Sequence, residues 1–288
     1  MQPSAHFSNL CEKSEISTHT IAFIGGGQMT KAIVNGLLKS GCISKDQIAI
    51  SVATSASMKR WKQDGFENCF ADNSELLKAF GEGIIVLALK PQMRKQLYSS
   101  ISSESLNKAG LVISIMAGIN LKALEEELAE KGYTVGVARM MPNLPASVGA
   151  GASVLSVSGN LTDSKKGLVK FIGNQFGICM EVDEISFNAA AAIAGCTPAF
   201  VFSMIDAIAD GGVLGGVNRS TALKLAAQTI LGASKMVLDT GVHPGILKDD
   251  VCSPAGTTIF GLRVLEERGM RTAFIEAISA STKRSMEL

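Results

Sequence analysis

Three consecutive glycines, Gly25–Gly27, separate an apolar run from an amphipathic run in the stretch IAFIGGGQMTKAI, residues 21–33. The spacing Gly25-x-Gly27-x-x-Thr30 nearly matches the dinucleotide fingerprint Gly-x-Gly-x-x-Gly/Ala. In that fingerprint the first glycine permits a tight turn and the second lets a pyrophosphate approach the backbone. The N-terminus of the following helix supplies free N–H groups and a positive dipole end. Thr30 departs from the fingerprint, so the stretch fits either a phosphate-binding loop or a plain strand–turn–helix.

Short apolar runs alternate with amphipathic runs through the first half of the chain. One helix is expected to end at Gly41, and another to run from an Asn120 N-cap to Gly132. Parallel strands that are buried on both faces read as continuous apolar runs. Such β-rich runs lie at residues 20–25, 47–52, 83–89, 111–117, 134–142, 152–158 and 178–182. The alternation predicts an α/β fold, with an N-terminal Rossmann-type domain and a doubly wound parallel sheet over residues 20–182.

After Asp183 the strand signals cease, and residues 183–288 are expected to form a C-terminal all-α domain with helices at 184–211, 219–239, 257–268 and 270–287. The stretch 188–217 is apolar enough to suggest a membrane span, but Pro198, Asp206 and Asp210 argue against one, because charges in lipid are costly. A helix that is apolar on nearly every side is better explained by burial in an oligomer. The second domain is therefore expected to mediate a homodimer, or a higher homo-oligomer, with no membrane partner.

Composition excludes several classes of protein. A net charge of +1 gives no reason to expect nucleic acid or an anionic membrane as a partner. The six cysteines are far apart, with no C-x-x-C motif and no pairing with histidine, so no disulfide framework and no metal site are expected. Reduced thiols indicate a cytoplasmic location. Residues 1–19 are polar and lack the apolar core of a signal peptide, which predicts a disordered leader.

Three strand ends carry features of a cofactor site, and ligands of doubly wound sheets bind beyond the carboxyl ends of the strands. They are Gly25–Gly27, Lys90-Pro91 and Ala117-Gly118. The Lys90 ammonium fits a cofactor phosphate or ribose, or equally a solvated loop.

The choice of dinucleotide follows from a missing carboxylate. NAD-selective sites usually place an Asp or Glu about 20 residues after the glycines, to accept the ribose hydroxyls. Here the second strand is followed by hydroxyl side chains at residues 54, 55 and 57 and by Lys59 and Arg60, and no carboxylate appears until Asp64. Hydroxyls and cations suit a 2′-phosphate, which a carboxylate would repel. The sequence therefore favours NADPH, with NADH as a weaker alternative.

The residues that usually protonate a reduced ketone are scarce in the second half of the chain. Such donors are His, Lys or Tyr, yet no lysine lies between Lys170 and Lys224, the histidines are His6, His19 and His243, and both tyrosines precede residue 134. A protonated imine fits better, because it is already electrophilic and becomes a neutral amine when hydride is added. A loop of small residues, 253–258, opens a helix and suits either an anion or a simple N-cap.

The stretch LKDDVCSPAGTTIFGLRVLEERG, residues 247–269, resembles the signature of 1-pyrroline-5-carboxylate reductases, the last enzymes of proline biosynthesis. Other matching segments follow in family order: FIGGGQM (23–29), ALKP (88–91), SIMAG (114–118), RMMPNLP (139–145), DAIADGG (206–212) and GASKMV (232–237). The resemblance covers nearly the whole chain from residue 20 onward. It implies an NAD(P)H-dependent oxidoreductase that acts on a C=N bond.

The resemblance also implies roles for individual residues. Thr258 and Ser253 are the implied catalytic residues: the Thr258 hydroxyl hydrogen-bonds the ring nitrogen, and Ser253 helps to hold the substrate carboxylate. Implied substrate contacts are Glu184, Val251, Cys252, Ser253, Thr257 and Thr258. Implied cofactor contacts are Gly25, Gly27, Gln28, Met29, Thr54, Ser55, Asn73, Ala88, Leu89, Lys90, Pro91, Ala117, Gly118 and Asp250.

Several positions depart from the family pattern. Residues 194–198 read Ala-Gly-Cys-Thr-Pro where Ser-Gly-Ser-Gly-Pro is usual, and Asn188 stands where an acidic residue is common. Thr30, Leu144 and Ala255 also differ. Two alternatives stay open at this point: a related β-hydroxyacid dehydrogenase or imine reductase, and a non-catalytic NADP-binding paralogue.

Overall fold

The computed structural model describes residues 3–287, which divide into two compact units. The first unit extends to Gly195 and takes in the chain again from Ser281, and the second comprises Cys196–Ala280. The domain boundary expected after residue 182 falls at the start of helix α9 (Glu184–Leu214), which begins in the first unit and continues into the second.

The described residues of the first unit form one eight-stranded sheet in the order β3-β2-β1-β4-β5-β6-β7-β8. Every neighbouring pair is parallel except β6 and β7, which are antiparallel. The expected doubly wound α/β class is confirmed, and the antiparallel pair is an addition to it. The strands are β1 (Ile21–Ile24), β2 (Ile48–Ser51), β3 (Cys69–Phe70), β4 (Ile84–Leu87), β5 (Leu111–Ser114), β6 (Val137–Met141), β7 (Gly151–Val157) and β8 (Gly177–Glu181).

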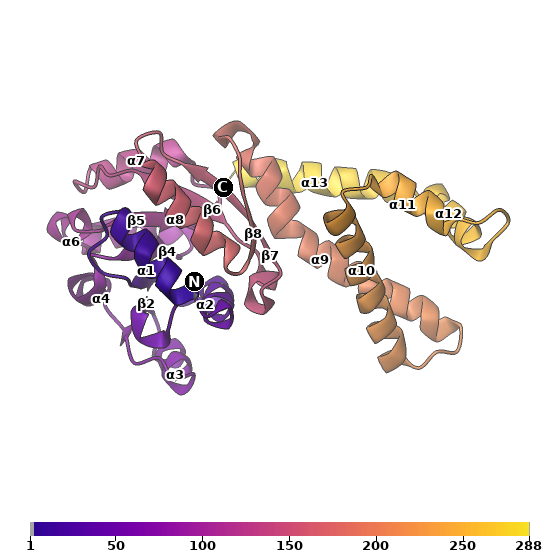
Figure 1. The fold of residues 1–288 in the computed structure, drawn as a ribbon, viewed down its shortest axis with the longest axis horizontal. Coiled ribbons are helices and arrows are strands. Elements are labelled where there is room, and N and C mark those ends of the chain that lie inside the picture. The colour runs from indigo at the N-terminus through magenta and orange to yellow at the C-terminus, as the bar shows by residue number, and fades with distance from the viewer. Residues whose placement is uncertain (1–2, 288) are drawn as a thin grey trace. The chain divides into compact units, whose positions relative to one another are not determined.

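The central strands are apolar at nearly every position because helices cover both faces of the sheet (Figure 1). Ile21 and Phe23 of β1 point to one face, while Ala22 and Ile24 point to the other. The first face packs against α1 (Pro3–Lys13), α2 (Gln28–Ser40), α3 (Ser55–Gln63) and α8 (Asp163–Asn174). The second packs against α4 (Asn73–Phe80), α5 (Arg94–Ser100), α6 (Ser103–Asn107) and α7 (Leu121–Ala129).

Helix α1 occupies part of the segment for which the sequence predicts a disordered leader, and that prediction is wrong for residues 3–13. The side chains of Phe7 and Cys11 are fully buried in the core, and the His6 ring meets the Phe171 ring of α8 edge-on at 4.9 Å. The apolar stripe of this helix is short and lies among polar residues. The helix could therefore not be recognised from its own sequence without knowing that it packs against α8. Residues 1–2 lie outside the described part of the chain.

The second unit is helical, as expected. It contains most of α9, then α10 (Arg219–Thr240), α11 (Pro244–Val251), α12 (Thr257–Glu267) and most of α13 (Met270–Met286). Helix α11 was not among the helices expected from the sequence. By length and composition alone, α9 is the one described helix that would be able to cross a membrane.

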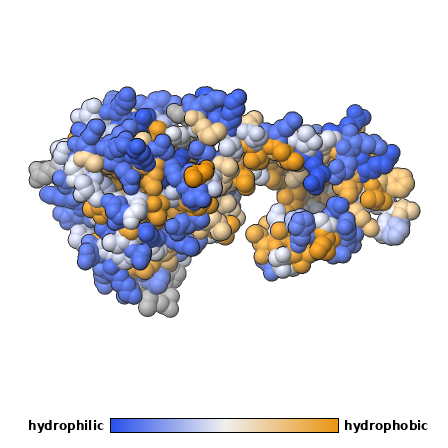
Figure 2. All heavy atoms as spheres, turned by 90° about the horizontal axis from the view of Figure 1, so that it is seen from above, coloured by the Kyte–Doolittle hydropathy of each residue, from blue (hydrophilic) through white to orange (hydrophobic). Residues whose placement is uncertain are grey.

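The helical unit buries few side chains within itself. Its buried hydrophobic residues, among those described, are all alanines, namely Ala209, Ala222 and Ala226. Figure 2 shows hydrophobic side chains gathered on its surface, and large ones such as Leu238 and Phe260 are more than half exposed. A face of this kind is typical of an interface with another chain.

The packing of α1 predicts a measurable contribution to stability. We expect Phe7→Ala to lower the free energy of unfolding by about 3–5 kcal/mol, because a fully buried aromatic ring is replaced by a cavity. Ser4→Ala, on the same helix but exposed, should change it by less than about 0.5 kcal/mol. Urea unfolding followed by circular dichroism measures both, and an unchanged Phe7→Ala midpoint would show that α1 does not pack as described.

Candidate functional site

Each of the three consecutive glycines has its own structural reason. Gly25 has a φ of +112°, and a Cβ there would lie 2.5 Å from the Ala88 carbonyl oxygen at the end of β4. A Cβ on Gly26 would lie 2.5 Å from Cγ1 of Val52 and 2.6 Å from Nε1 of Trp61. Gly27 is the N-cap of α2, makes no side-chain cap, and would have nothing within 4 Å of a Cβ. The first two glycines are required by packing, and the third leaves the N-terminus of α2 open to a ligand.

Thr30 fills the position at which the fingerprint has a third small residue. Its side chain is buried, and its Oγ1 donates a 2.5 Å hydrogen bond to the Gly25 carbonyl oxygen. The hydroxyl of this residue in the first turn of α2 thereby holds the glycine turn by its backbone. This departure from the fingerprint therefore preserves the turn.

A cluster of hydroxyl groups and one guanidinium lies at the N-terminus of α3. Thr54 is the N-cap: its Oγ1 accepts a 3.2 Å hydrogen bond from the Ser57 amide. The Ser57 hydroxyl accepts from the Arg60 guanidinium at 3.0 Å. One cavity of about 200 Å³ is lined by residues of both this cluster and the glycine loop, including Gly27, Gln28, Ser57 and Arg60. This arrangement has the donors and the positive charge that a phosphate requires.

The same cavity contains a residue that the sequence did not single out. Lys31, on the first turn of α2, lines the cavity and forms an ion pair with Asp64 at 2.9 Å. Both side chains are nearly half exposed. The sequence could have indicated Lys31, because it follows Gly27 by four residues and positions four apart lie on the same side of a helix.

A second cavity, of about 270 Å³, is lined by residues at the carboxyl ends of β1 and β2. It brings together three of the predicted cofactor residues, Gly25, Asn73 and Leu89. Ser51 lines it and accepts a 3.3 Å hydrogen bond from the Gly25 amide. Met93, Gln96 and Ser100 also line it but were not predicted.

The remaining predicted cofactor residues of the first unit lie at or near the same strand ends. Ser55 is the exposed first residue of α3, and the Met29 side chain packs against the core. Ala88, Lys90 and Pro91 follow β4, and the Lys90 side chain is exposed. Ala117 and Gly118 follow β5, where Gly118 has a φ of +75°. Asp250 is separate, since it lies on α11 in the helical unit.

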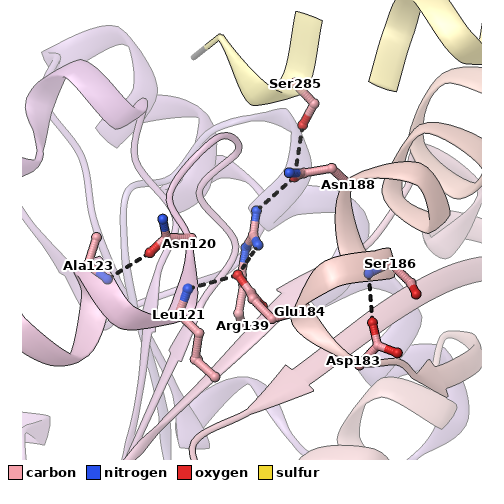
Figure 3. A network of polar contacts seen from close by, with 9 residues as sticks. All are labelled: Asn120, Leu121, Ala123, Arg139, Asp183, Glu184, Ser186, Asn188 and Ser285. Carbon is pink, nitrogen blue, oxygen red and sulfur yellow. Dashed lines mark hydrogen bonds and ion pairs between the residues drawn. The ribbon is translucent and has the colours of Figure 1, made fainter. Parts of the chain in front are cut away.

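A buried ion pair holds the segment that follows the β5 loop (Figure 3). Arg139 of β6 is 2% exposed and donates to the Glu184 carboxylate, which also accepts a 2.9 Å hydrogen bond from the Leu121 amide of α7. Asn188 accepts from the Arg139 guanidinium and from the Ser285 hydroxyl, each at 3.3 Å. Glu184, predicted to contact substrate, is thus engaged with the sheet and with α7.

The Arg139 charge is expensive to bury. Burial lowers the pKa of this guanidinium, and the Glu184 carboxylate opposes that shift. The guanidinium also stacks 3.8 Å from the centre of the Phe187 ring. One Glu184 oxygen and the Arg139 Nε are buried without a hydrogen-bond partner in the part of the chain that the structure describes. The pair is therefore only partly compensated, and it depends on both partners.

The predicted substrate loop lies in the helical unit. Gly256 is the N-cap of α12, with no side-chain cap, and its amide donates a 3.0 Å hydrogen bond to the Ser253 carbonyl. Thr257 and Thr258 are the first two residues of the helix and are exposed. The loop does supply the N-cap of the helix, as one of the two alternatives expected, but no side chain caps the free N–H groups. Ala255 has a φ of +56°, a backbone region that favours glycine. Uncapped N–H groups beside exposed hydroxyls suit a carboxylate.

The other predicted substrate residues flank this loop. Val251 ends α11 with its side chain 64% exposed, and Cys252 is partly buried. Ser253 is exposed. Among the described residues, no group of three or more histidine, cysteine or acidic side chains is arranged to hold a metal ion.

Comparison with known proteins gives the family. The chain is 40% identical over 268 residues to the pyrroline-5-carboxylate reductase of Escherichia coli K12, with 93% of this chain and 97% of the relative covered. The chain belongs to the pyrroline-5-carboxylate reductase family. The Arabidopsis thaliana reductase is 38% identical over 272 residues, with 93% and 95% of the two chains covered. The predicted family is therefore confirmed.

Domain and structure comparisons agree with this membership of the pyrroline-5-carboxylate reductases. Residues 184–288 match the model for pyrroline-5-carboxylate reductase dimerisation, and residues 20–118 match that for NADP oxidoreductase, coenzyme F420-dependent. The crystal structure of Plasmodium falciparum pyrroline carboxylate reductase with NADP bound has a TM-score of 0.82 at 30% identity, covering 93% of this chain and 97% of that one.

The ion pair at the β5 loop predicts a coupled effect on stability. Glu184→Gln should cost up to about 3 kcal/mol, because it leaves the Arg139 cation buried without a carboxylate. Solvent reaches the Glu184 side chain, which is 32% exposed, and this keeps the cost below that of a fully buried pair. The double variant Arg139→Met/Glu184→Gln should lose less than the sum of the two single variants. Urea unfolding of all three measures this coupling, and strictly additive losses would contradict it.

Proposed function

We propose that this chain reduces 1-pyrroline-5-carboxylate to L-proline, with NADPH as the hydride donor, in the last step of proline biosynthesis. The observation that carries the proposal is the uncapped N-terminus of α12 beside Ser253, within the segment that matches the family signature. Identity of about 40% to named reductases over nearly the whole chain supports it.

The substrate is held by its carboxylate and its ring nitrogen. The free N–H groups of the first turn of α12, together with Ser253, bind the carboxylate at the positive end of the helix dipole. The Thr258 hydroxyl hydrogen-bonds the ring nitrogen, and Val251 packs on the ring. Hydride adds to the carbon of the protonated imine and the C=N π electrons become the lone pair of the nitrogen, which keeps its proton, so the product is a neutral amine. No residue needs to protonate an alkoxide, which agrees with the scarcity of such donors.

The cofactor is held by the first unit, and it supplies the hydride when bound. The open N-terminus of α2 after Gly27 receives the pyrophosphate. Thr54, Ser55, Ser57 and Arg60 at the start of α3 receive the 2′-phosphate. The match to an NADP oxidoreductase model and the NADP in the Plasmodium structure support NADPH as the preferred cofactor.

The helical unit makes the chain a homodimer or a higher homo-oligomer. Its match to a dimerisation model and its exposed apolar side chains support this assembly. The proposed location is the cytoplasm, where six reduced thiols are stable.

One assay tests the proposed reaction. The purified chain should oxidise NADPH when pyrroline-5-carboxylate is added and should form L-proline in equal amount. A panel of hydroxyacids with NADP⁺ should give no comparable rate. Turnover of a hydroxyacid, or NADPH binding without turnover of the imine, would replace this function by one of the alternatives left open by the sequence.

Cofactor choice is expected to depend on Thr54. The wild type should favour NADPH over NADH in kcat/KM by roughly tenfold or more, since a charge-assisted contact is worth about 1.5–3 kcal/mol. Thr54→Asp should shrink or reverse this ratio, because Asp retains the N-cap of α3 but repels the phosphate. Thr54→Asn, a neutral cap, is the matched control and should keep the preference for NADPH. Equal discrimination by the Asp variant and the wild type would place the phosphate elsewhere.

Thr258 and Ser253 are expected to affect different kinetic constants. Thr258→Val removes a hydrogen bond that strengthens toward the transition state, so kcat should fall by about ten- to a hundredfold. Stability should change little, because the cap of α12 is Gly256. Ser253→Ala should mainly raise KM for the imine, because the serine hydroxyl that it removes binds the carboxylate equally in the ground state and in the transition state. Steady-state kinetics on folded variants decides, and unchanged kcat in Thr258→Val would remove its catalytic role.

A further inference from the structure

Trp61, the single tryptophan of the chain, lies directly behind the glycine loop. It is 4% exposed, and its indole Nε1 donates a 3.0 Å hydrogen bond to the Gly26 carbonyl oxygen. The ring packs edge-on against Phe66, with the centroids 4.9 Å apart. Trp61 also lines the cavity that contains Gly27, Gln28, Ser57 and Arg60.

The hydrogen bond fixes the direction of one peptide plane. In a planar trans peptide the C=O and the N–H point to opposite sides. Because the Gly26 oxygen points to the indole, the Gly27 N–H of the same peptide points away from it. Within the described part of the chain, this N–H has no hydrogen-bond partner, and the space around Gly27 is open.

The carbonyl oxygens of Gly25 and Gly26 each accept a hydrogen bond from a side chain, so neither is free to face a phosphate. Thr30 binds the Gly25 oxygen and Trp61 binds the Gly26 oxygen. A carbonyl oxygen facing a phosphate would repel it, whereas N–H groups attract it. The indole occupies the place where a side chain on residue 26 would lie, since a Cβ there would be 2.6 Å from Nε1.

We infer that Trp61 is a positioning residue for the dinucleotide pyrophosphate, which acts by holding the Gly26–Gly27 peptide with its N–H toward the ligand. The inference rests on the proposed function, because it assigns a role within the same cofactor site. It concerns the part of the cofactor that NADPH and NADH share. Trp61 therefore raises affinity for both, whereas Thr54 discriminates between them.

The test compares Trp61→Phe with Phe66→Leu. Trp61→Phe removes the indole N–H and keeps an aromatic ring, while Phe66→Leu disturbs the same aromatic pair and leaves the N–H in place. Calorimetric titration of Trp61→Phe should show a Kd raised by roughly five- to tenfold for NADPH and for NADH alike, the size of one hydrogen bond. Its kcat at saturating NADPH and its KM for the imine should stay within about twofold. Phe66→Leu should bind both cofactors nearly as the wild type does.

Several results would overturn the inference. These are wild-type affinities in Trp61→Phe, weakening of NADPH alone, or an equal loss in Phe66→Leu, which would indicate simple packing. If the wild type itself binds neither cofactor, the proposed function fails as well, so the two failures are distinguishable.

A second measurement does not depend on the folding of a variant. The wild type has a single indole N–H resonance, which should be protected from exchange with solvent and should shift when NADPH or NADH is added. A rapidly exchanging resonance would contradict the hydrogen bond, and a protected one that neither cofactor shifts would contradict the role.

Discussion

The carboxyl ends of β1 and β4 come so close that no side chain fits between them. A Cβ on Gly25 would lie 2.5 Å from the Ala88 carbonyl oxygen. In the sheet β1 lies between β2 and β4. From β1 the strands β2 and β3 extend the sheet to one side, and β4 and β5 extend it to the other, so the strand order reverses at this point. Because the chain must turn away at once after β1, only three residues separate the end of this strand from the start of α2. The position of the open helix N-terminus, and with it the proposed cofactor site, follows from this contact.

A second constraint is the charge buried in the sheet. Arg139 occupies the middle of β6, where its neighbours on β5 and β7 are Ser114 and Ser156. Its guanidinium requires a carboxylate, and Glu184 supplies one from the first residue of α9. The same carboxylate binds the first amide of α7, immediately beyond the loop that contains Ala117 and Gly118. One ion pair therefore connects the sheet, the start of α9 and a proposed cofactor loop.

Local patterns predicted every strand but β3, the glycine turn, helices α2 and α7, and the helices of the second unit except α11, because each depends on neighbours in sequence. The Asn120 cap is confirmed in the same way, with its side chain accepting from the Ala123 amide. Helix α1 and the two-residue strand β3 were missed, since both depend on partners distant in sequence. The structural role of Arg139 was not predicted, although the residue lies in the family segment RMMPNLP. An arginine inside the apolar run 134–142 was nonetheless a signal, because a buried cation needs an anionic partner. The roles of Thr30 and Trp61 could be recognised only from the structure. Both side chains bind backbone carbonyl oxygens, and because every residue has one, the sequence does not show which of them is bound.

The first unit is discontinuous along the chain, and this has a consequence for synthesis on the ribosome. Asn188 is made early, but the Ser285 hydroxyl that donates to it lies near the end of α13 and is made much later. Between Gly195 and Ser281 the ribosome must make the whole helical unit, which takes several seconds at about 5–20 residues per second. During that interval the sheet and its glycine loop are complete in sequence, while the start of α9 lacks its last partner. The nascent chain therefore carries a nearly finished nucleotide-binding half well before translation reaches the residues that close it.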